Sequence, residues 1–369
     1  MENMNKDSKV KSINTSKSSG MNKKRNVILI VILVIVVALI GCFAAYKVSI
    51  GPVEKGNDKE VVVEIEPGSS TTAIAHILKE NDTVKSEFFF KLKSKLGGYD
   101  GKFQAGKYGF SKAMSAEEQM NMMINGETLG KMFTVVEGTN SKKIGEALEK
   151  QGIIKAEDFY KELEQGEFNY EFLKNVPKGP GRLEGFLYPE TYKFELGDSA
   201  HSIIDQMLKQ FERVYNETYK SQLDGKNIHQ VMTVASIVER EAKTDEDKEN
   251  VASVIYNRLD VNMPLQMDSI LAYITGEEKI KASLDDTKVE STYNPYQNRG
   301  LPPGPICSPS EASIKAAINP PDTKYIYFVA TEKLDGTNVF SETYDQFLKD
   351  KAKFDKAYRE YIKEHPGKK

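Results

Sequence analysis

The chain has 369 residues, 51 of them basic and 54 acidic, and its formal net charge is −3. The first 25 residues hold seven basic and two acidic side chains, so the rest carries −8, which argues against a nucleic-acid surface. The four histidines lack metal-ligand spacing and no glycine-rich loop follows a predicted strand, so neither a metal nor a nucleotide cofactor is expected. The length allows two or three domains.

An uncharged apolar run occupies residues 27–46, directly after Lys23, Lys24 and Arg25. At about 1.5 Å per residue, twenty helical residues cross a hydrocarbon core of about 30 Å. The basic residues before the run predict a cytoplasmic tail at 1–25, a transmembrane helix at 26–47 and an extracytoplasmic body.

Two alternatives to a retained anchor stay open. A cleaved signal peptide has a shorter apolar core than this run. Residues 39–42 also resemble a lipoprotein cleavage box, with Cys42 as the acylated residue, although the long basic tail argues against it. In either case the body lies outside the membrane.

The segment after the anchor predicts a small mixed module. Residues 48–60 lack periodicity and indicate a linker. A strand at 61–65, a return strand at 107–110 and three helices are expected. The helices fall around 74–78, at 88–96 and at 115–124.

This pattern recurs about seventy residues later. The matching positions of the first copy are Gly68, Ser69, Ile74, Leu78, Val84, Lys85, Glu87, Phe89 and Phe90, and those of the second are Gly138, Thr139, Ile144, Leu148, Ile154, Lys155, Glu157, Phe159 and Tyr160. The order strand, turn, helix, loop, helix in both copies suggests a duplicated unit.

The remainder predicts helices mixed with few strands, after a joint at Gly179-Pro180-Gly181. Helices are expected at 200–219, 227–242, 249–259 and 341–362, and a strand at 325–330. The last helix should turn Tyr344, Phe347, Leu348 and Phe354 inward. Without regular strand–helix alternation, the fold class is α+β.

Glu239 ends the segment Ala235-Ser-Ile-Val-Glu and lies at the edge of an apolar helical stripe. Its spacing from Met232 and Ala235 puts it on their side, whereas Glu241 should face water. Apolar surroundings should raise the pKa of Glu239, so that it could donate a proton near neutral pH. The alternative is an ordinary boundary glutamate on an amphipathic helix.

Several blocks in one order resemble the endolytic murein transglycosylase family, also called MltG or YceG-like. They are Arg182–Tyr192, Ala235–Glu239, Tyr256–Leu259, Met263–Asp268, Tyr293-Asn294, Gly300–Ile306 and Tyr325–Val329. The resemblance implies a LysM-like module at 61–132, a mixed α+β catalytic domain at 133–362 and a short tail at 363–369. The LysM-like module would read glycan or serve only as a spacer.

The resemblance also implies a lytic transglycosylase at the cell membrane that cuts nascent peptidoglycan strands between N-acetylmuramic acid and N-acetylglucosamine. Glu239 would be the single acid and then base, and the product would carry a 1,6-anhydro end. Polar cleft residues would be Glu184, Asn257, Gln266, Asp268, Tyr293 and Asn294. Capping and turn formation are the alternative roles of the two asparagines, and Glu184 could instead cap a loop.

Two other functions compete with this one. If Asp268 lay across the cleft from Glu239, two carboxylates could support a water-using muramidase. A non-enzymatic wall-binding scaffold is the third possibility, and the intact block around Glu239 argues against it. The resemblance names glycan polymerases with penicillin-binding domains as partners.

Overall fold

The computed structural model describes residues 18–277 and 283–365, in two compact units, Met1–Leu129 and Gly130–Lys369. Three two-stranded antiparallel sheets lie among the helices, which confirms the α+β class. The predicted boundary between residues 132 and 133 falls inside β3 (Lys131–Thr134). Much of the predicted tails at 1–25 and 363–369 lies outside the described residues.

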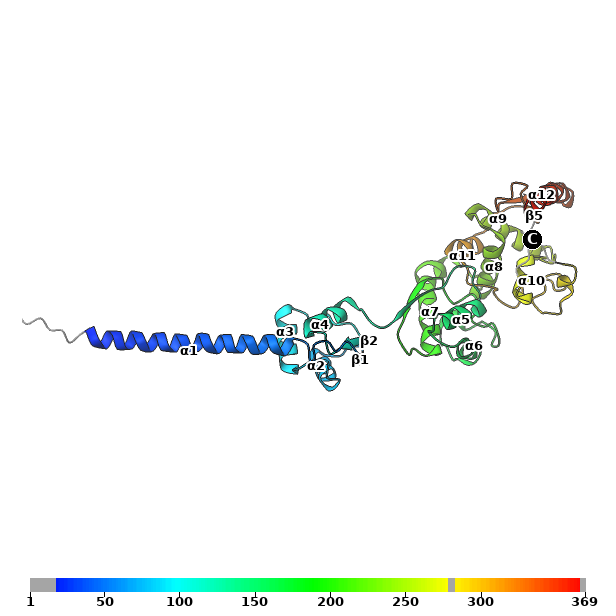
Figure 1. Cartoon of the computed structure of the whole chain (residues 1–369). Helices are drawn as coiled ribbons and strands as arrows, with labels where there is room; N and C mark the ends of the chain where they lie inside the picture. Colours follow the sequence, from blue (N-terminus) through cyan, green and yellow to red (C-terminus); the bar gives the residue numbers. More distant parts are fainter. Residues whose placement is uncertain (1–17, 278–282, 366–369) are drawn as a thin grey trace, which may run out of the picture. The chain divides into compact units, whose positions relative to one another are not determined.

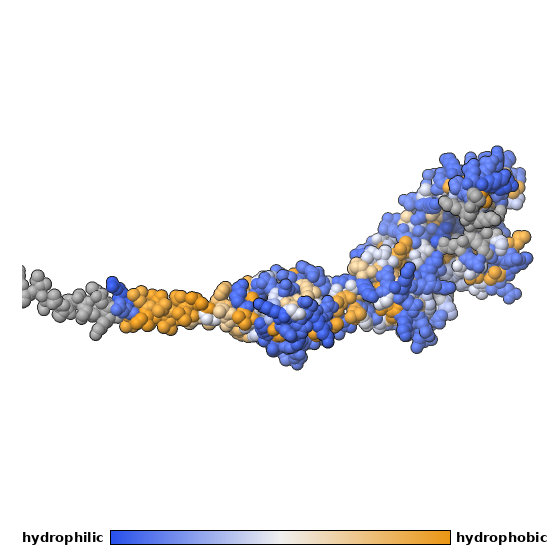
Figure 2. Space-filling view, viewed as in Figure 1, coloured by the Kyte–Doolittle hydropathy of each residue, from blue (hydrophilic) through white to orange (hydrophobic). Residues whose placement is uncertain are grey.

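The first helix, α1, runs from Ser18 to Ile50 (Figure 1). Its stretch Lys24–Ile50 is long and apolar enough to cross a membrane, and Figure 2 shows apolar residues along it. Side chains from Val27 to Phe43 are largely exposed, as expected of a helix without a protein partner on any side.

Residues 51–59 contain no helix or strand, as expected of the predicted linker at 48–60, but the segment is shorter than predicted and is attached to the first unit. The helix continues to Ile50, whose side chain is only 7% exposed in the core of the first unit. Gly51-Pro52 then ends the helix. The backbone N–H of Glu54 donates to Lys112 (2.9 Å), so the segment is bound to the fold.

The first unit contains the predicted strands and helices. Strands β1 (Glu60–Ile65) and β2 (Gly106–Ser111) are antiparallel, with Val63 opposite Tyr108. Between them lie α2 (Thr71–Glu80) and α3 (Glu87–Gly97). Helix α4 (Ala116–Asn125) follows and begins with a capping box. Apolar side chains of all these elements form one core.

The duplicated sequence pattern corresponds to two copies of one strand–helix–helix motif. In the second copy β3 is followed by α5 (Ser141–Lys150) and α6 (Ala156–Gln165), and β3 pairs with β4 (Thr191–Phe194). Helices α2 and α5 have the same length and begin seventy residues apart. The second helices begin 69 residues apart, so the buried Phe90 corresponds to Phe159 and not to Tyr160.

Helix α8 (Ile228–Glu241) is the central helix of the second unit and packs against α9 (Asp245–Asp260) and α11 (Glu311–Ile318). Every side chain from Val231 to Val238 is buried. Around it lie α7 (Ala200–Val214) with a π-turn at Tyr215–Tyr219, α9 (Asp245–Asp260), α10 (Asp268–Thr275) and α11 (Glu311–Ile318). Short 3₁₀ turns occur at Glu171–Leu173, Lys220–Gln222 and Asp286–Lys288. The predicted helices at 200–219, 227–242 and 249–259 are confirmed.

The C-terminal elements are β5 (Tyr327–Ala330), β6 (Asn338–Ser341) and α12 (Tyr344–Glu364). The helix is where the sequence predicts it, but its predicted inward face is only partly covered. Leu348 is 43% exposed, and Tyr344 is 56% exposed although its ring lies 5.7 Å from that of Tyr327. Helix α12 lies on a sheet of only two strands, through contacts such as Phe347 on Tyr327 (ring centroids 5.4 Å apart). That sheet is too small to bury a whole helix face.

Candidate active site

The carboxylate of Glu239 lies at the N-terminus of α11. Its Oε2 accepts hydrogen bonds from the backbone N–H of Ser310 (3.1 Å), the Ser310 hydroxyl and the Ser313 hydroxyl (2.6 Å). The ammonium of Lys248 on α9 is 3.2 Å from the same oxygen. Among residues 18–277 and 283–365, no hydrogen bond is made to Oε1.

The predicted rise in the pKa of Glu239 is wrong for this structure. Burial does act to raise the pKa, since the side chain is only 11% exposed. The hydroxyls of Ser310 and Ser313, the Ser310 N–H and the charge of Lys248 outweigh burial, so the pKa lies below its ordinary value. The N-terminal end of α11 favours the same ionised form.

Ser310, Ser313 and Lys248 were not among the residues predicted for the site. A signal for Ser310 is present, because a serine followed by Glu311-Ala312-Ser313 and an apolar run is a typical helix start. Ser310 is indeed the N-cap of α11. Nothing in the local sequence indicates that this cap meets a carboxylate 71 residues earlier in the chain.

Glu241 does not simply face water as predicted. It is half-buried and its Oε1 accepts the backbone N–H of Ser269 (3.2 Å). Burial, and to a smaller degree the charge of Asp268, raise the pKa of Glu241. Asp268 itself accepts a hydrogen bond from the hydroxyl of Tyr296 (2.7 Å). The structure therefore groups Asp268 with Glu241.

Glu184 is buried, with only 2% of its surface exposed, and it connects α5 to α10. Its carboxylate accepts the N–H (3.0 Å) and hydroxyl (2.7 Å) of Ser141, the first residue of α5. The hydroxyl of Tyr273 on α10 is 3.4 Å away. Burial raises the pKa of Glu184 to about 7, although these hydrogen bonds act to lower it. It holds α5 to α10 and caps α5.

Replacement of Glu184 by glutamine should change how stability depends on pH. The folded-state pKa of about 7 exceeds the ordinary 4.5, so the folded state binds this proton more tightly. The contribution of this group to the free energy of unfolding is fully present below pH 4.5. It is lost as the pH rises through 7, and the loss is about 3 kcal/mol. The melting temperature of the full-length wild type in detergent should therefore fall more between pH 5 and pH 8 than that of Glu184→Gln.

The control for this prediction is Glu217→Gln, which changes an exposed glutamate in the same unit. This variant should follow the wild type at both pH values. If Glu184→Gln also follows the wild type, Glu184 does not titrate in this range.

The side-chain amides of Asn257 and Asn294 donate hydrogen bonds to backbone carbonyls. The amide of Asn257 donates to the carbonyls of Thr323 and Tyr325, both at 2.9 Å. Asn294 is fully buried and donates to Val289 (2.7 Å). Both arrangements correspond to the loop-forming alternative.

Gln266 and Tyr293 occupy loops. Gln266 is exposed, with a left-handed backbone (φ 47°). The ring of Tyr293 lies 5.3 Å from that of Tyr273, and burial raises the pKa of Tyr293 to about 12. Tyr293 therefore supports Tyr273, which lines the pocket described next.

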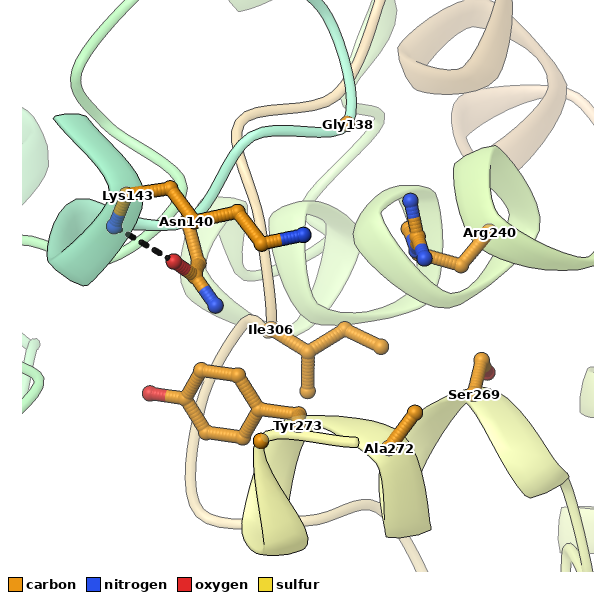
Figure 3. A pocket seen from close by; sticks show the side chains of 9 residues that line it. Gly138, Asn140, Lys143, Arg240, Ser269, Ala272, Tyr273 and Ile306 are labelled. Atoms are coloured by element: carbon orange, nitrogen blue, oxygen red, sulfur yellow. Dashed lines mark hydrogen bonds between the residues drawn. The ribbon is translucent and has the colours of Figure 1, made fainter. Parts of the chain in front are cut away.

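A small pocket of about 40 Å³ lies between α5, α8 and α10 (Figure 3). Its lining residues are Gly138, Asn140, Lys143, Arg240, Ser269, Ala272, Tyr273, Gly276 and Ile306. Glu239 lies against the same turn, because a Cβ placed on Gly138 would be 3.8 Å from its Cγ. The N–H of Gly138 donates to Ser308 (2.8 Å), and that of Ser308 to Thr139 (2.9 Å). The β3–α5 turn is thus joined to the chain leading to Ser310.

A family described as the YceG-like family matches residues 63–353. The endolytic murein transglycosylase of Bacillus subtilis strain 168 is 39% identical over 332 residues, which are 85% of this chain and 90% of that protein. A Streptococcus pneumoniae D39 protein of the same name is 32% identical over 311 residues, 76% of this chain and 56% of that protein.

A solved structure is also similar. It is the 2.6 Å crystal structure of a protein from Listeria monocytogenes described as YceG-like, with 32% sequence identity and a TM-score of 0.54. The match covers 79% of this chain and 99% of the Listeria chain.

Proposed function

We infer that this chain, which belongs to the YceG-like family, is a lytic transglycosylase that acts on peptidoglycan. The observation that carries the inference is the 39% identity with the Bacillus subtilis endolytic murein transglycosylase over 85% of the chain. The site supports it, because a carboxylate in the matching segment lies against a pocket.

Glu239 supplies both proton transfers of the proposed reaction. Its acid form protonates the oxygen between N-acetylmuramic acid and N-acetylglucosamine, and the C1–O bond breaks. Its carboxylate then takes the proton of the muramic acid 6-hydroxyl as that oxygen bonds to C1. A 1,6-anhydro ring forms and water is not consumed. One side chain therefore begins and ends the cycle protonated.

The asymmetry of the Glu239 contacts supports this use. Oε2 is held by Ser310, Ser313 and Lys248, whereas Oε1 has no hydrogen-bond partner among the described residues. Oε1 is therefore the oxygen that would exchange the proton with the sugar. The partners on Oε2 favour the carboxylate, the form that the second step requires.

Product masses in ¹⁸O-labelled water test the reaction. Uncrosslinked glycan strands treated with the full-length protein in detergent should yield ends one water lighter than reducing ends, without ¹⁸O. Reducing ends that carry ¹⁸O would show the hydrolytic alternative. Strand binding without any new end would show the scaffold alternative.

We propose that α1 anchors the chain in the cell membrane, with its N-terminus in the cytoplasm. The length and composition of Lys24–Ile50, and the basic Lys24 and Arg25 at its start, support this. Protease added outside intact protoplasts should digest the folded units, and their protection would exclude this orientation. Glycan reading by the first unit as a LysM-like module, and glycan polymerases as partners, rest on the resemblance alone and stay predictions.

A further inference from the structure

Helix α3 of the first unit has an apolar side that faces away from the core. Phe90 and Ser94 are buried and mark the core side of the helix. Phe88, Leu92 and Leu96 follow one another at four-residue spacing on the other side, and we call them the outer stripe. Phe88 and Leu96 are 64% and 72% exposed. A surface helix usually carries polar residues on this side, so the outer stripe requires an explanation.

Exposed apolar side chains of the first unit are concentrated on this helix. After α1, the unit exposes three large apolar side chains, Val62, Phe88 and Leu96, and two of them belong to the outer stripe. Lys91 and Lys95 each lie three residues after a member of the stripe, so they border it. An apolar stripe with lysines at its border is typical of helices that lie in the surface of a membrane.

The contacts of α3 with α1 place the outer stripe at the end of the membrane span. The ring of Phe89 packs edge-on against that of Tyr46 (centroids 6.0 Å apart), and the ammonium of Lys85 donates to the carbonyl of Val48 (3.1 Å). Figure 1 shows α3 where α1 meets the first unit. About twenty helical residues cross a hydrocarbon core, and Tyr46 is the twentieth residue of the uncharged run that starts at Val27. Helix α3 therefore begins at the level where acyl chains give way to headgroups.

We propose that the outer stripe of α3 is a membrane-docking surface, which lies among the headgroups and upper acyl chains of the leaflet that faces the folded units. This inference rests on the proposed anchoring by α1 and is independent of glycan cleavage. Phe88 and Leu96 enter the apolar boundary, and the bordering lysines contact lipid phosphates. Lipid is the expected partner because the stripe adjoins the span: Phe88 lies against Phe89 (ring centroids 5.2 Å apart), which lies against Tyr46.

A single tryptophan tests the docking. The chain contains no tryptophan, so Phe88→Trp introduces the only one. The full-length variant is reconstituted into liposomes of phosphatidylglycerol and phosphatidylcholine, with or without lipid that is brominated close to the headgroup. Bromine quenches tryptophan only at short range. We expect the brominated lipid to lower the emission of Phe88→Trp by at least about twofold.

The matched control is Val62→Trp, at the exposed apolar position of the unit that lies on β1. Iodide in the water should quench Val62→Trp, and the brominated lipid should leave its emission within about a fifth. Equal quenching of the two variants by the lipid would overturn the docking. Protection of Phe88→Trp from both quenchers would also overturn it, because protein would then cover the stripe.

A charge in the outer stripe provides a second check. Leu96 is 72% exposed, so Leu96→Asp should leave the fold intact. Added to Phe88→Trp, it should reduce the quenching by brominated lipid to about half, and unchanged quenching would contradict the docking. Release of both tryptophan variants from floated liposomes by alkaline carbonate would instead contradict the anchor, and the docking with it. A failure of the lytic reaction would appear only in the product masses.

Discussion

Replacement of Glu239 by glutamine abolishes glycan cleavage, with a loss of at least about a thousandfold, while the protein stays folded. Glutamine fills the same volume and its side-chain oxygen can still accept from Ser310 and Ser313. It cannot transfer a proton, and general acid–base groups contribute up to about 10⁴-fold. The measurement is the rate of release of anhydro ends from uncrosslinked strands, with the melting temperature as the check on folding.

Glu241→Gln is the informative companion of this variant, because Glu241 lies two residues further along α8 and has the raised pKa that the sequence assigns to Glu239. We expect Glu241→Gln to keep activity within about tenfold, since its carboxylate is engaged by Ser269 and lies beside Asp268. If Glu241→Gln is inactive and Glu239→Gln is active, the acid is Glu241.

Replacement of Gly185 by alanine should have the largest effect on stability. Gly185 has φ 82°, and a Cβ there would lie 2.6 Å from Cβ of Pro305 and 3.4 Å from the carbonyl of Cys307. The left-handed backbone costs alanine about 1–2 kcal/mol, and the overlap adds about 1–3 kcal/mol. Relief requires movement of the segment that carries Ile306 of the pocket, so activity should also be lost.

Gly225→Ala separates the cost of the left-handed backbone from the cost of the steric overlap. Gly225 has a similar φ of 80°, but a Cβ there would meet nothing within 4 Å. In thermal unfolding of the full-length protein, Gly185→Ala should melt about 5 °C or more below Gly225→Ala, and only Gly225→Ala should keep cleaving glycan. Equal melting temperatures would mean that the Pro305 segment moves aside at no cost.

Patterns that are local in the sequence predicted the fold well. The apolar spacing that identified α8 reflects contacts within one helix, and the repeat at seventy residues reflects two similar helix pairs. The predicted linker starts too early in the chain, because Ile50 is still helical and belongs to the core of the first unit, which the residues around it do not reveal. The predicted inward face of α12 is incompletely buried, because amphipathicity gives the direction of a face but not the size of the surface that covers it.

The electrostatics of the site could not be predicted from the sequence. The apolar surroundings of Glu239 were correctly expected, but the hydroxyls of Ser310 and Ser313 that reverse the shift of its pKa lie 71 and 74 residues further along. Glu184 was expected at the cleft or at a loop, and the structure makes it the buried link behind Tyr273. Contacts of this kind depend on tertiary structure.

The continuation of α1 into the core of the first unit has a mechanical consequence. Because Ile50 ends the helix and is also a core residue, no flexible linker separates the apolar span from the core of the first unit. In a membrane, a tilt of the spanning helix would therefore tilt the first unit with it. The distance between that unit and the lipid headgroups would stay constant. An insertion of several flexible residues between Gly51 and Glu54 would uncouple the two and allow that distance to vary.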